Sequence, residues 1–475
     1  MQSIAPATFA NLLTRRQLFS RVGGGFAGLA LSSLFGELRA DGQIPHDLLP
    51  RSPHHTPKAT AVIQLFMHGG PSQMDLWDPK PALDKYDGQK PPREIEIPSL
   101  SVSQAGGLLR SPFKFQKHGR SGVDVSEVMP HIAEMVDELA VIRSMHTGHN
   151  NHEQALWMMH TGLLTSGRPN IGSWVTYALG SENHNLPAYV VLCDPGGVPV
   201  DGVRNWSSGW MPPLFQGTPL RTQGSPILNL QPAQPVADAV RSGQLELLAR
   251  LNGDHQQRHP DLADLEARIN AYELAARLQL SATEALDLGK ENAATRKLYG
   301  LDNPATASYG TRCLLARRLV ERGVRFVQIF MRGQPWDTHG KNAETLRQIC
   351  GQTDLPVTGL LKDLKQRGLL DSTLVFWGGE FGRLPIAQSR DGRDHNRHAF
   401  TLWLAGGGVR GGVVHGSTDE LGYAAAENKV SVPDLHATML HLLGLDHRRL
   451  TFRHNARDER LTDVHEARIV DEILA

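Results

Sequence analysis

Carboxylates, histidines and arginines gather in four short stretches of this sequence, in combinations that bind a divalent metal ion or an anion. The richest stretch, residues 377–383 followed by 392–395, holds three candidate metal ligands and two arginines: Glu380, Asp394, His395, Arg383 and Arg393. Carboxylate and imidazole together suit zinc or a similar divalent ion. The arginines are candidates to bind a substrate anion through bidentate hydrogen bonds. The alternative is a surface network of salt bridges at a sheet edge.

A second stretch, residues 336–339, contributes Asp337 and His339 shortly after an apolar run at 325–330. Its acid and imidazole favour a metal site. In the alternative, Asp337 caps a helix that begins near Lys341, while His339 is simply exposed.

A third stretch, residues 68–75, follows the apolar run 61–66 and offers His68 and Asp75 as metal ligands. The glycines between them allow the backbone to approach a ligand closely. An ordinary β-turn with a solvated histidine explains this stretch equally well.

The fourth stretch, residues 146–153, is dense in histidine and lies immediately before an expected helix, whose N-terminal amides could hold an anion. The alternative is N-capping by Asn150 or Asn151. No His-Glu-x-x-His motif is present here, so a zincin protease is not supported.

Alternating strands and helices are expected to position these stretches. Strands are predicted at 61–66, 141–142, 188–192, 325–330, 373–377 and 401–405, and helices at 126–139, 152–160, 235–250, 261–280, 343–367 and 433–443. This alternation predicts an α/β fold, with a mostly parallel sheet covered by helices on both faces. Three of the polar stretches follow strands, where α/β proteins commonly place their chemistry.

Composition narrows the class of partner. The 475 residues carry a formal net charge of +0, which argues against a nucleic-acid binder or a polybasic membrane anchor and favours a small-molecule or glycan partner. The 22 histidines, in a chain with only 6% aromatic residues, raise the expectation of metal binding. Three widely spaced cysteines argue against a disulfide framework.

The N-terminus resembles a twin-arginine export signal. Arg15 and Arg16 precede a glycine-containing apolar segment at 23–35 that is too short to remain as a membrane span. We expect a signal peptide at 1–40, a linker at 41–59 and the folded domain at 60–475, with export by the twin-arginine (Tat) machinery to the periplasm or another extracytoplasmic location. The alternative is an amphipathic N-terminal helix.

These motifs together resemble an exported bacterial family. They are His-Gly-Gly-Pro-Ser-Gln-x-Asp at 68, Trp-Asp-Thr-His at 336, Gly-Glu-Phe-Gly-Arg at 379, Gly-Arg-Asp-His at 392 and the glycine-rich run at 405–412. The family is domain-of-unknown-function family number fifteen-oh-one, in the alkaline phosphatase and sulfatase superfamily. The resemblance implies an alkaline phosphatase/sulfatase-like α/β/α sandwich with metal at the C-terminal ends of its strands.

The chain differs from the sulfatases of this superfamily at the position of the nucleophile. Where sulfatases have Cys-Ser-Pro-Ser-Arg, nine residues before Thr-Gly, this chain has His152 and no serine, threonine or cysteine. A metal-activated water is therefore the expected nucleophile, and a catalytic role for His152 is the alternative.

The resulting hypothesis is a metal-dependent hydrolase of phosphate or sulfate esters that uses one or two divalent ions, zinc, calcium or similar. The rival hypotheses are a catalytically inactive sulfatase-like binding protein of the cell envelope and an exported scaffold without metal. Scattered positions for His68, His339 and His395 would favour the scaffold.

Overall fold

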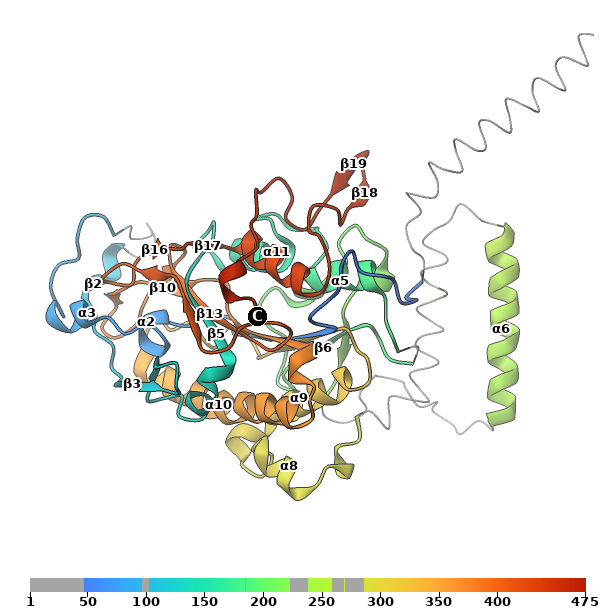
Figure 1. Ribbon diagram of the computed structural model, residues 1–475, viewed down its shortest axis with the longest axis horizontal. Helices are drawn as coiled ribbons and strands as arrows, with labels where there is room; N and C mark the ends of the chain where they lie inside the picture. The colour runs from blue at the N-terminus through green and yellow to red at the C-terminus, as the bar shows by residue number, and fades with distance from the viewer. Residues whose placement is uncertain (1–46, 96–101, 184, 223–237, 259–268, 270–285) are drawn as a thin grey trace, which may run out of the picture. The chain divides into compact units, whose positions relative to one another are not determined.

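The computed structural model describes residues 47–475 except 96–101, 184, 223–237, 259–268 and 270–285 (Figure 1). The predicted signal peptide and nearly all of the predicted helix at 261–280 lie outside the described residues. Contacts divide the chain into residues 46–454 with 458–475, and residues 1–45 with 455–457. The fold and the site described below belong to the first unit.

A central sheet organises the described chain. Nine strands form it, eight of them in the order β14-β5-β13-β9-β1-β8-β6-β7, with β17 pairing to β5. Their bounds are β1 Ala61–Phe66, β5 Leu139–His146, β6 Tyr189–Leu192, β7 Thr218–Leu220, β8 Phe326–Phe330, β9 Thr373–Gly378, β13 Phe400–Ala405, β14 Val413–His415 and β17 Val430–Ser431. All pairs are parallel except those that β13 makes with β5 and β9.

The central strands are buried on both faces, which explains why they appear in the sequence as continuous apolar runs. Every residue of β1, β8, β9 and β13 is buried. The predicted strands were therefore found, and the one expected at 141–142 extends over all of β5.

Helices cover both faces of the sheet, as the alternating pattern predicted. In Figure 1, α9 and α10 lie on one side of the sheet, and α5 and α11 lie on the other. The helices are α2 Gln73–Leu76, α3 Pro81–Lys85, α4 His152–Thr161, α5 Ile171–Leu179, α6 Asp238–Arg258, α8 Ala293–Leu298, α9 Pro304–Val320, α10 Asn342–Gln366 and α11 Val432–Leu442. The α/β fold class is thus confirmed.

One predicted helix was wrong. The segment 126–139 begins at the last residue of strand β4 (Val123–Ser126) and continues into a 3-10 helix, η2, at Ile132–Glu138. Two backbone amides at its start, those of His131 and Ile132, donate to the Asp354 carboxylate at 2.7 and 2.9 Å. The start of this segment is therefore tied to α10.

Short strands outside the central sheet shape the loops. They are β2 Ala105–Leu108, β3 Phe115–His118, β4, β10 Gly382–Arg383, β11 Ile386–Gln388, β12 His395–Asn396, β15 Ser417–Thr418, β16 Ala425–Glu427, β18 Phe452–His454 and β19 Arg457–Glu459. The β10–β12 pair matters most for function, because it folds the segment after β9 back on itself and sets Arg383 opposite His395.

Five chain segments meet at one edge of the sheet. Strand β1 pairs in parallel with β8 and β9, and Phe66 lies opposite both Phe330 and Gly378, so these three strands end together. Because β13 runs antiparallel to β5 and β9, its first residue, Phe400, lies at this same edge, opposite Met145 near the end of β5. The predicted polar stretches therefore converge.

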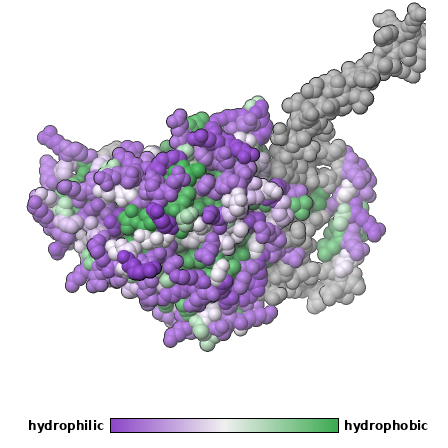
Figure 2. All heavy atoms as spheres, in the orientation of Figure 1, coloured by the Kyte–Doolittle hydropathy of each residue, from purple (hydrophilic) through white to green (hydrophobic). Residues whose placement is uncertain are grey.

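Hydrophilic residues cover most of the face seen in Figure 2, with hydrophobic residues in patches near its centre.

Among the described helices, none combines the length and the apolar character needed to cross a membrane.

Candidate functional site

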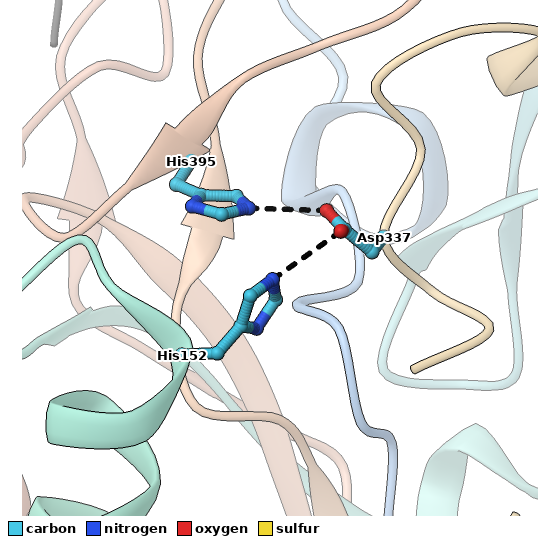
Figure 3. Close-up of side chains that lie close together, drawn as sticks. All are labelled: His152, Asp337 and His395. Atoms are coloured by element: carbon cyan, nitrogen blue, oxygen red, sulfur yellow. Dashed lines mark hydrogen bonds and ion pairs between the residues drawn. The ribbon is translucent and has the colours of Figure 1, made fainter. Parts of the chain in front are cut away.

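Three residues from three different elements form the centre of the site. His152 is the first residue of α4, after the N-cap Asn151, and His395 opens β12. Asp337 lies in the loop between β8 and α10. Figure 3 shows both imidazoles directed at the Asp337 carboxylate.

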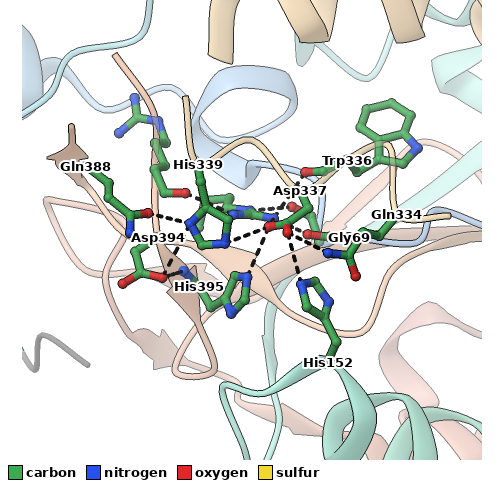
Figure 4. A network of polar contacts seen from close by, with 12 residues as sticks. Gly69, His152, Gln334, Trp336, Asp337, His339, Gln388, Asp394 and His395 are labelled. Atoms are coloured by element: carbon green, nitrogen blue, oxygen red, sulfur yellow. Dashed lines mark hydrogen bonds and ion pairs between the residues drawn. The ribbon is translucent and has the colours of Figure 1, made fainter. Parts of the chain in front are cut away.

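The Asp337 carboxylate is surrounded by five nitrogen-bearing side chains, among them Gln334, whose amide nitrogen donates to it at 2.8 Å (Figure 4). The Nε2 atoms of His152, His339 and His395 lie 3.3, 3.0 and 3.0 Å from its oxygens. Arg383 donates to it at 2.6 Å. Burial opposes ionisation of Asp337, but the three histidines and the arginine lower its pKa far below the ordinary value. Asp337 is therefore an anion under all ordinary conditions.

Each imidazole also makes a hydrogen bond through its other ring nitrogen, Nδ1, on the side away from Asp337. His152 Nδ1 lies 2.6 Å from Glu380, His395 Nδ1 lies 2.7 Å from the Asn150 carbonyl oxygen, and His339 Nδ1 bonds to Gln388 Oε1. A carbonyl oxygen can only accept, so His395 must carry its proton on Nδ1 when it is neutral. In this neutral form the unprotonated Nε2 faces an Asp337 oxygen, and His395 donates to that oxygen only when its ring is protonated.

Glu380 supports His152. The carboxylate is completely buried and accepts the Gly69 amide at 2.9 and 3.2 Å. Burial opposes its ionisation, but the hydrogen bond and charge of His152 lower its pKa. In turn, burial would lower the pKa of His152, yet its interactions with the Asp337 and Glu380 carboxylates raise it to about 9. Glu380, which was predicted as a metal ligand, therefore contacts the Nδ1 side of His152 and positions that imidazole.

A second group of possible ligands shares His395. His339 Nδ1 lies 3.8 Å from Asp394, and His339, Asp394 and His395 offer ligand atoms within 4.8 Å of one another. The His339 side chain is 39% exposed, so this end of the site faces solvent. The Asp337 hydrogen bond is the main cause of the raised pKa of His339.

The donor set fits a divalent cation. His152, Asp337 and His395 also offer ligand atoms within 4.8 Å of one another. In each group one buried atom has no hydrogen-bond partner in the described chain, namely His152 Nε2 in the first and Asp394 Oδ2 in the second. Imidazole nitrogens backed by carboxylate or carbonyl acceptors are the usual second shell of a bound metal.

The family was identified by comparison with known proteins. A family model described as "Protein of unknown function (DUF1501)" matches residues 59–474. The chain belongs to this family. The resemblance in the sequence motifs is confirmed by this match, which includes all the predicted site residues. No curated protein matches the chain.

Several solved structures are similar to this family member at low identity. The PsFucS1 sulfatase from Pseudoalteromonas sp. is 13% identical, with a TM-score of 0.36 over 88% of this chain and 74% of that one. The phosphonate monoester hydrolase SpPMH from Silicibacter pomeroyi is 12% identical, with a TM-score of 0.32 over 73% and 71%. The alkaline phosphatase from the Antarctic bacterium TAB5 is 11% identical, with a TM-score of 0.30 over 82% and 98%.

Two predicted site residues lie together in a separate ion pair. Arg393 donates to both Asp75 oxygens, at 2.7 and 3.0 Å, and neither side chain is exposed. Ser72 and Asn342 also donate to Asp75, at 2.6 and 2.8 Å. Burial opposes the ionisation of Asp75, but Arg393 and these hydrogen bonds lower its pKa. The pair joins the β1 loop to the β12 segment, and it leaves neither residue facing the three histidines.

Arg383 also differs from its predicted role as a substrate-binding arginine. It is fully buried and donates to the carbonyl oxygens of Gly70 and Arg393, both at 2.9 Å, and to that of Gly69, as well as to Asp337. Its charge therefore acts on Asp337, and its guanidinium fixes the loop after β1.

His68 lies behind the site, among aromatic rings. Its ring centroid is 4.9 Å from that of Phe66 and 5.5 Å from that of Phe330, and it is completely buried. Burial is the main cause of its lowered pKa, about 4. It is absent from both groups of converging ligand atoms, so the structure leaves it as a neutral packing residue next to Glu380 and His152.

Sequence reasoning missed the backbone and amide groups that hold the site. Gly69, Asn150 and Gln388 carry no charge, and nothing in the local pattern of Asn150 or Gln388 distinguishes them from ordinary loop residues. Gly69 alone had a usable signal, since it follows a strand in a glycine pair. Its φ of +113° and the backbone of Asp337, 2.4 Å from where a Cβ would stand, both require glycine.

Proposed function

We propose that this protein is a metal-dependent hydrolase of phosphate or sulfate esters that acts outside the cytoplasm. The observation that carries the proposal is the convergence of three imidazole Nε2 atoms on Asp337, each imidazole held at Nδ1 by a separate acceptor. His152, Asp337 and His395 would hold one divalent ion, and His339 and Asp394 would help to hold a second. A bound ion would supply Lewis-acid polarisation of the ester and would activate water.

Neighbouring residues would hold these ligand side chains in position before a cation binds. The ionised Glu380 and the Asn150 carbonyl orient His152 and His395, so no rotamer has to be fixed when a ligand binds. Against the effect of burial, interactions with the three histidines, together with the charge of Arg383, keep Asp337 ionised. Because the pKa of His152 is about 9, its imidazole carries a proton at neutral pH that must leave before Nε2 can bind a cation.

The absence of a hydroxyl or thiol at the first position of α4 supports water as the nucleophile. His152 occupies that position, and its Nε2 lies 3.3 Å from an Asp337 oxygen. A histidine nucleophile remains the alternative within the same proposal. The location rests on Arg15 and Arg16, which suit twin-arginine export.

The first test is metal analysis of the purified full-length protein. The double variant Asp337→Ala/His339→Ala removes a ligand from each group and should abolish bound metal. A matched control, Asp84→Ala/His118→Ala, changes the same residue types at α3 and β3, away from the site, and should leave the metal content unchanged. Equal metal content in wild type and in the Asp337→Ala/His339→Ala variant would refute the assignment.

The second test is turnover of simple aryl phosphates and sulfates by protein loaded in turn with zinc, calcium and other divalent ions. The rival function, a sulfatase-like binding protein without turnover, is favoured by the missing hydroxyl or thiol nucleophile. Metal binding without hydrolysis of any ester would support that rival. Hydrolysis that is lost in Glu380→Ala would support the enzyme.

A further inference from the structure

A basic cavity lies beside the site. It has a volume of about 180 Å³ and is lined by His146, Thr147, Arg397, His398 and Lys429, with two alanines. No acidic residue lines it in the described chain. At roughly 30 Å³ per water molecule, the cavity has room for about six waters, or for one oxyanion with part of its hydration shell.

One residue, Asn150, connects the cavity to the site. Its backbone oxygen accepts from His395 Nδ1 at 2.7 Å, and its side-chain oxygen accepts from the Arg397 amide at 2.8 Å. The Thr147 amide donates to the Arg397 carbonyl at 2.9 Å. The cavity wall is therefore formed by the two segments that also position His152 and His395.

The side chains that line the cavity bring positive charge to it, from Arg397 and Lys429. Burial lowers the pKa of His146, and the charges of Lys429 and His398 lower it further, whereas Asp434 opposes them. Asp434 is already engaged, because it accepts from the Ser431 amide at 2.9 Å in the capping box of α11. An anion in the cavity would offset this repulsion.

We propose that this cavity binds a second anionic group of the substrate, a sulfate, phosphate or carboxylate substituent, while the ester to be cleaved lies at Asp337. This inference rests on the proposed function, and it narrows the substrate class to esters that carry at least two anionic groups. Arg397 and Lys429 would provide the charge that distinguishes such substrates from esters with a single anionic group.

Anion binding can be tested apart from catalysis, on metal-free full-length protein. Calorimetric titration with inorganic sulfate at low ionic strength should show binding that weakens at least tenfold in Arg397→Gln/Lys429→Gln, since hydrogen bonds to charged groups contribute roughly 1.5–3 kcal/mol each. The control Lys117→Gln/Arg120→Gln has the same charge change on β3 and the turn after it, where the side chains are 71% and 96% exposed. It should bind sulfate as wild type does.

The activity arm compares two esters with the same leaving group, one with a second sulfate or carboxylate and one without. The ratio of their kcat/KM values should fall about tenfold in Arg397→Gln/Lys429→Gln and stay unchanged in the control. Absence of any turnover would count against the proposed function alone. Absence of sulfate binding in wild type, or equal losses in both double variants, would overturn the subsite. The single variant Lys429→Gln, at an exposed position, repeats the test if the double variant does not fold.

Discussion

Replacing Glu380 with glutamine tests whether this buried carboxylate controls the protonation of His152. Glutamine has nearly the same shape and keeps an oxygen that can accept the Gly69 amide, so the change mainly removes a negative charge 2.6 Å from His152 Nδ1. The expected result is a fall in the pKa of His152 from about 9 by about one to two pH units, because an opposite charge at this distance has an effect of that size.

The effect on stability follows from the same pKa. His152 titrates at about 9 in the folded protein and at 6.5 when unfolded, so the folded state holds the proton more tightly. This difference stabilises the metal-free protein by about 3 kcal/mol below pH 6.5, and the stabilisation is lost as the pH rises through 9. In Glu380→Gln roughly 40–80% of this pH dependence between 6.5 and 9.5 should disappear, because about one to two of the 2.5 pH units of the shift are lost.

The assay is urea unfolding of chelator-treated protein at several pH values, together with NMR titration of the His152 ring nitrogens. The control is Glu153→Gln, which removes an equal charge from an exposed residue next to His152. The free energy of unfolding of wild type should fall relative to Glu380→Gln as the pH rises, and Glu153→Gln should follow wild type. Parallel pH profiles for wild type and Glu380→Gln would refute the coupling.

Three further substitutions separate the structural residues from the site residues. Asp75→Asn should lower the free energy of unfolding by about 3–5 kcal/mol, because it leaves Arg393 buried and unpaired, without changing metal content. Gly69→Ala should cost at least about 2 kcal/mol and weaken metal binding, since its Cβ would stand 2.4 Å from the Asp337 amide. Between pH 7 and pH 5 the free energy of unfolding should fall by about 2 kcal/mol less in His436→Gln than in wild type. Burial lowers the pKa of His436 to about 4 in the folded protein, so in wild type only the unfolded histidine gains a proton over this range, and stability falls.

Each of these substitutions has a control at an unconstrained position. Asp84→Asn is exposed, Gly122→Ala has a positive φ but open space around its Cβ, and His118→Gln lies on β3. All are checked by urea unfolding and metal analysis. Loss of metal in Asp75→Asn, equal costs for the two glycine variants, or unchanged acid sensitivity in His436→Gln would each contradict the reasoning given for that residue.

The architecture could be predicted because its strands are buried on both faces and therefore stand out as apolar runs. The sequence could not show that β13 runs antiparallel, since a buried strand looks the same in either direction. This orientation has a functional consequence. It brings the segment before Phe400, with His395, to the edge where β1, β8 and β9 end.

The sequence allowed the residue types of the site to be predicted, but not which of these residues would lie together. Asp337 and Asp75 both follow strands near histidines, and nothing local distinguishes them. They differ in their long-range partners, because the Asp75 oxygens receive Arg393 while those of Asp337 face three imidazoles. Similarly, Glu380 has the chemistry of a ligand, but its hydrogen bond to His152 makes it a positioning residue. Partners more than 200 residues apart in sequence cannot be assigned without the fold.

Fold stability alone does not account for the groups around Asp337. One buried carboxylate needs one cation, and Arg383 already supplies it at 2.6 Å. Bringing His152 and His395 to the same carboxylate adds the cost of burying polar groups, and His152 Nε2 has no partner with hydrogen-bond geometry there. Apolar side chains of similar volume would stabilise this edge of the sheet as well or better. A surplus of aligned nitrogen donors that the fold does not require is what a cation-binding site needs, and this surplus separates the Asp337 cluster from the Asp75–Arg393 pair.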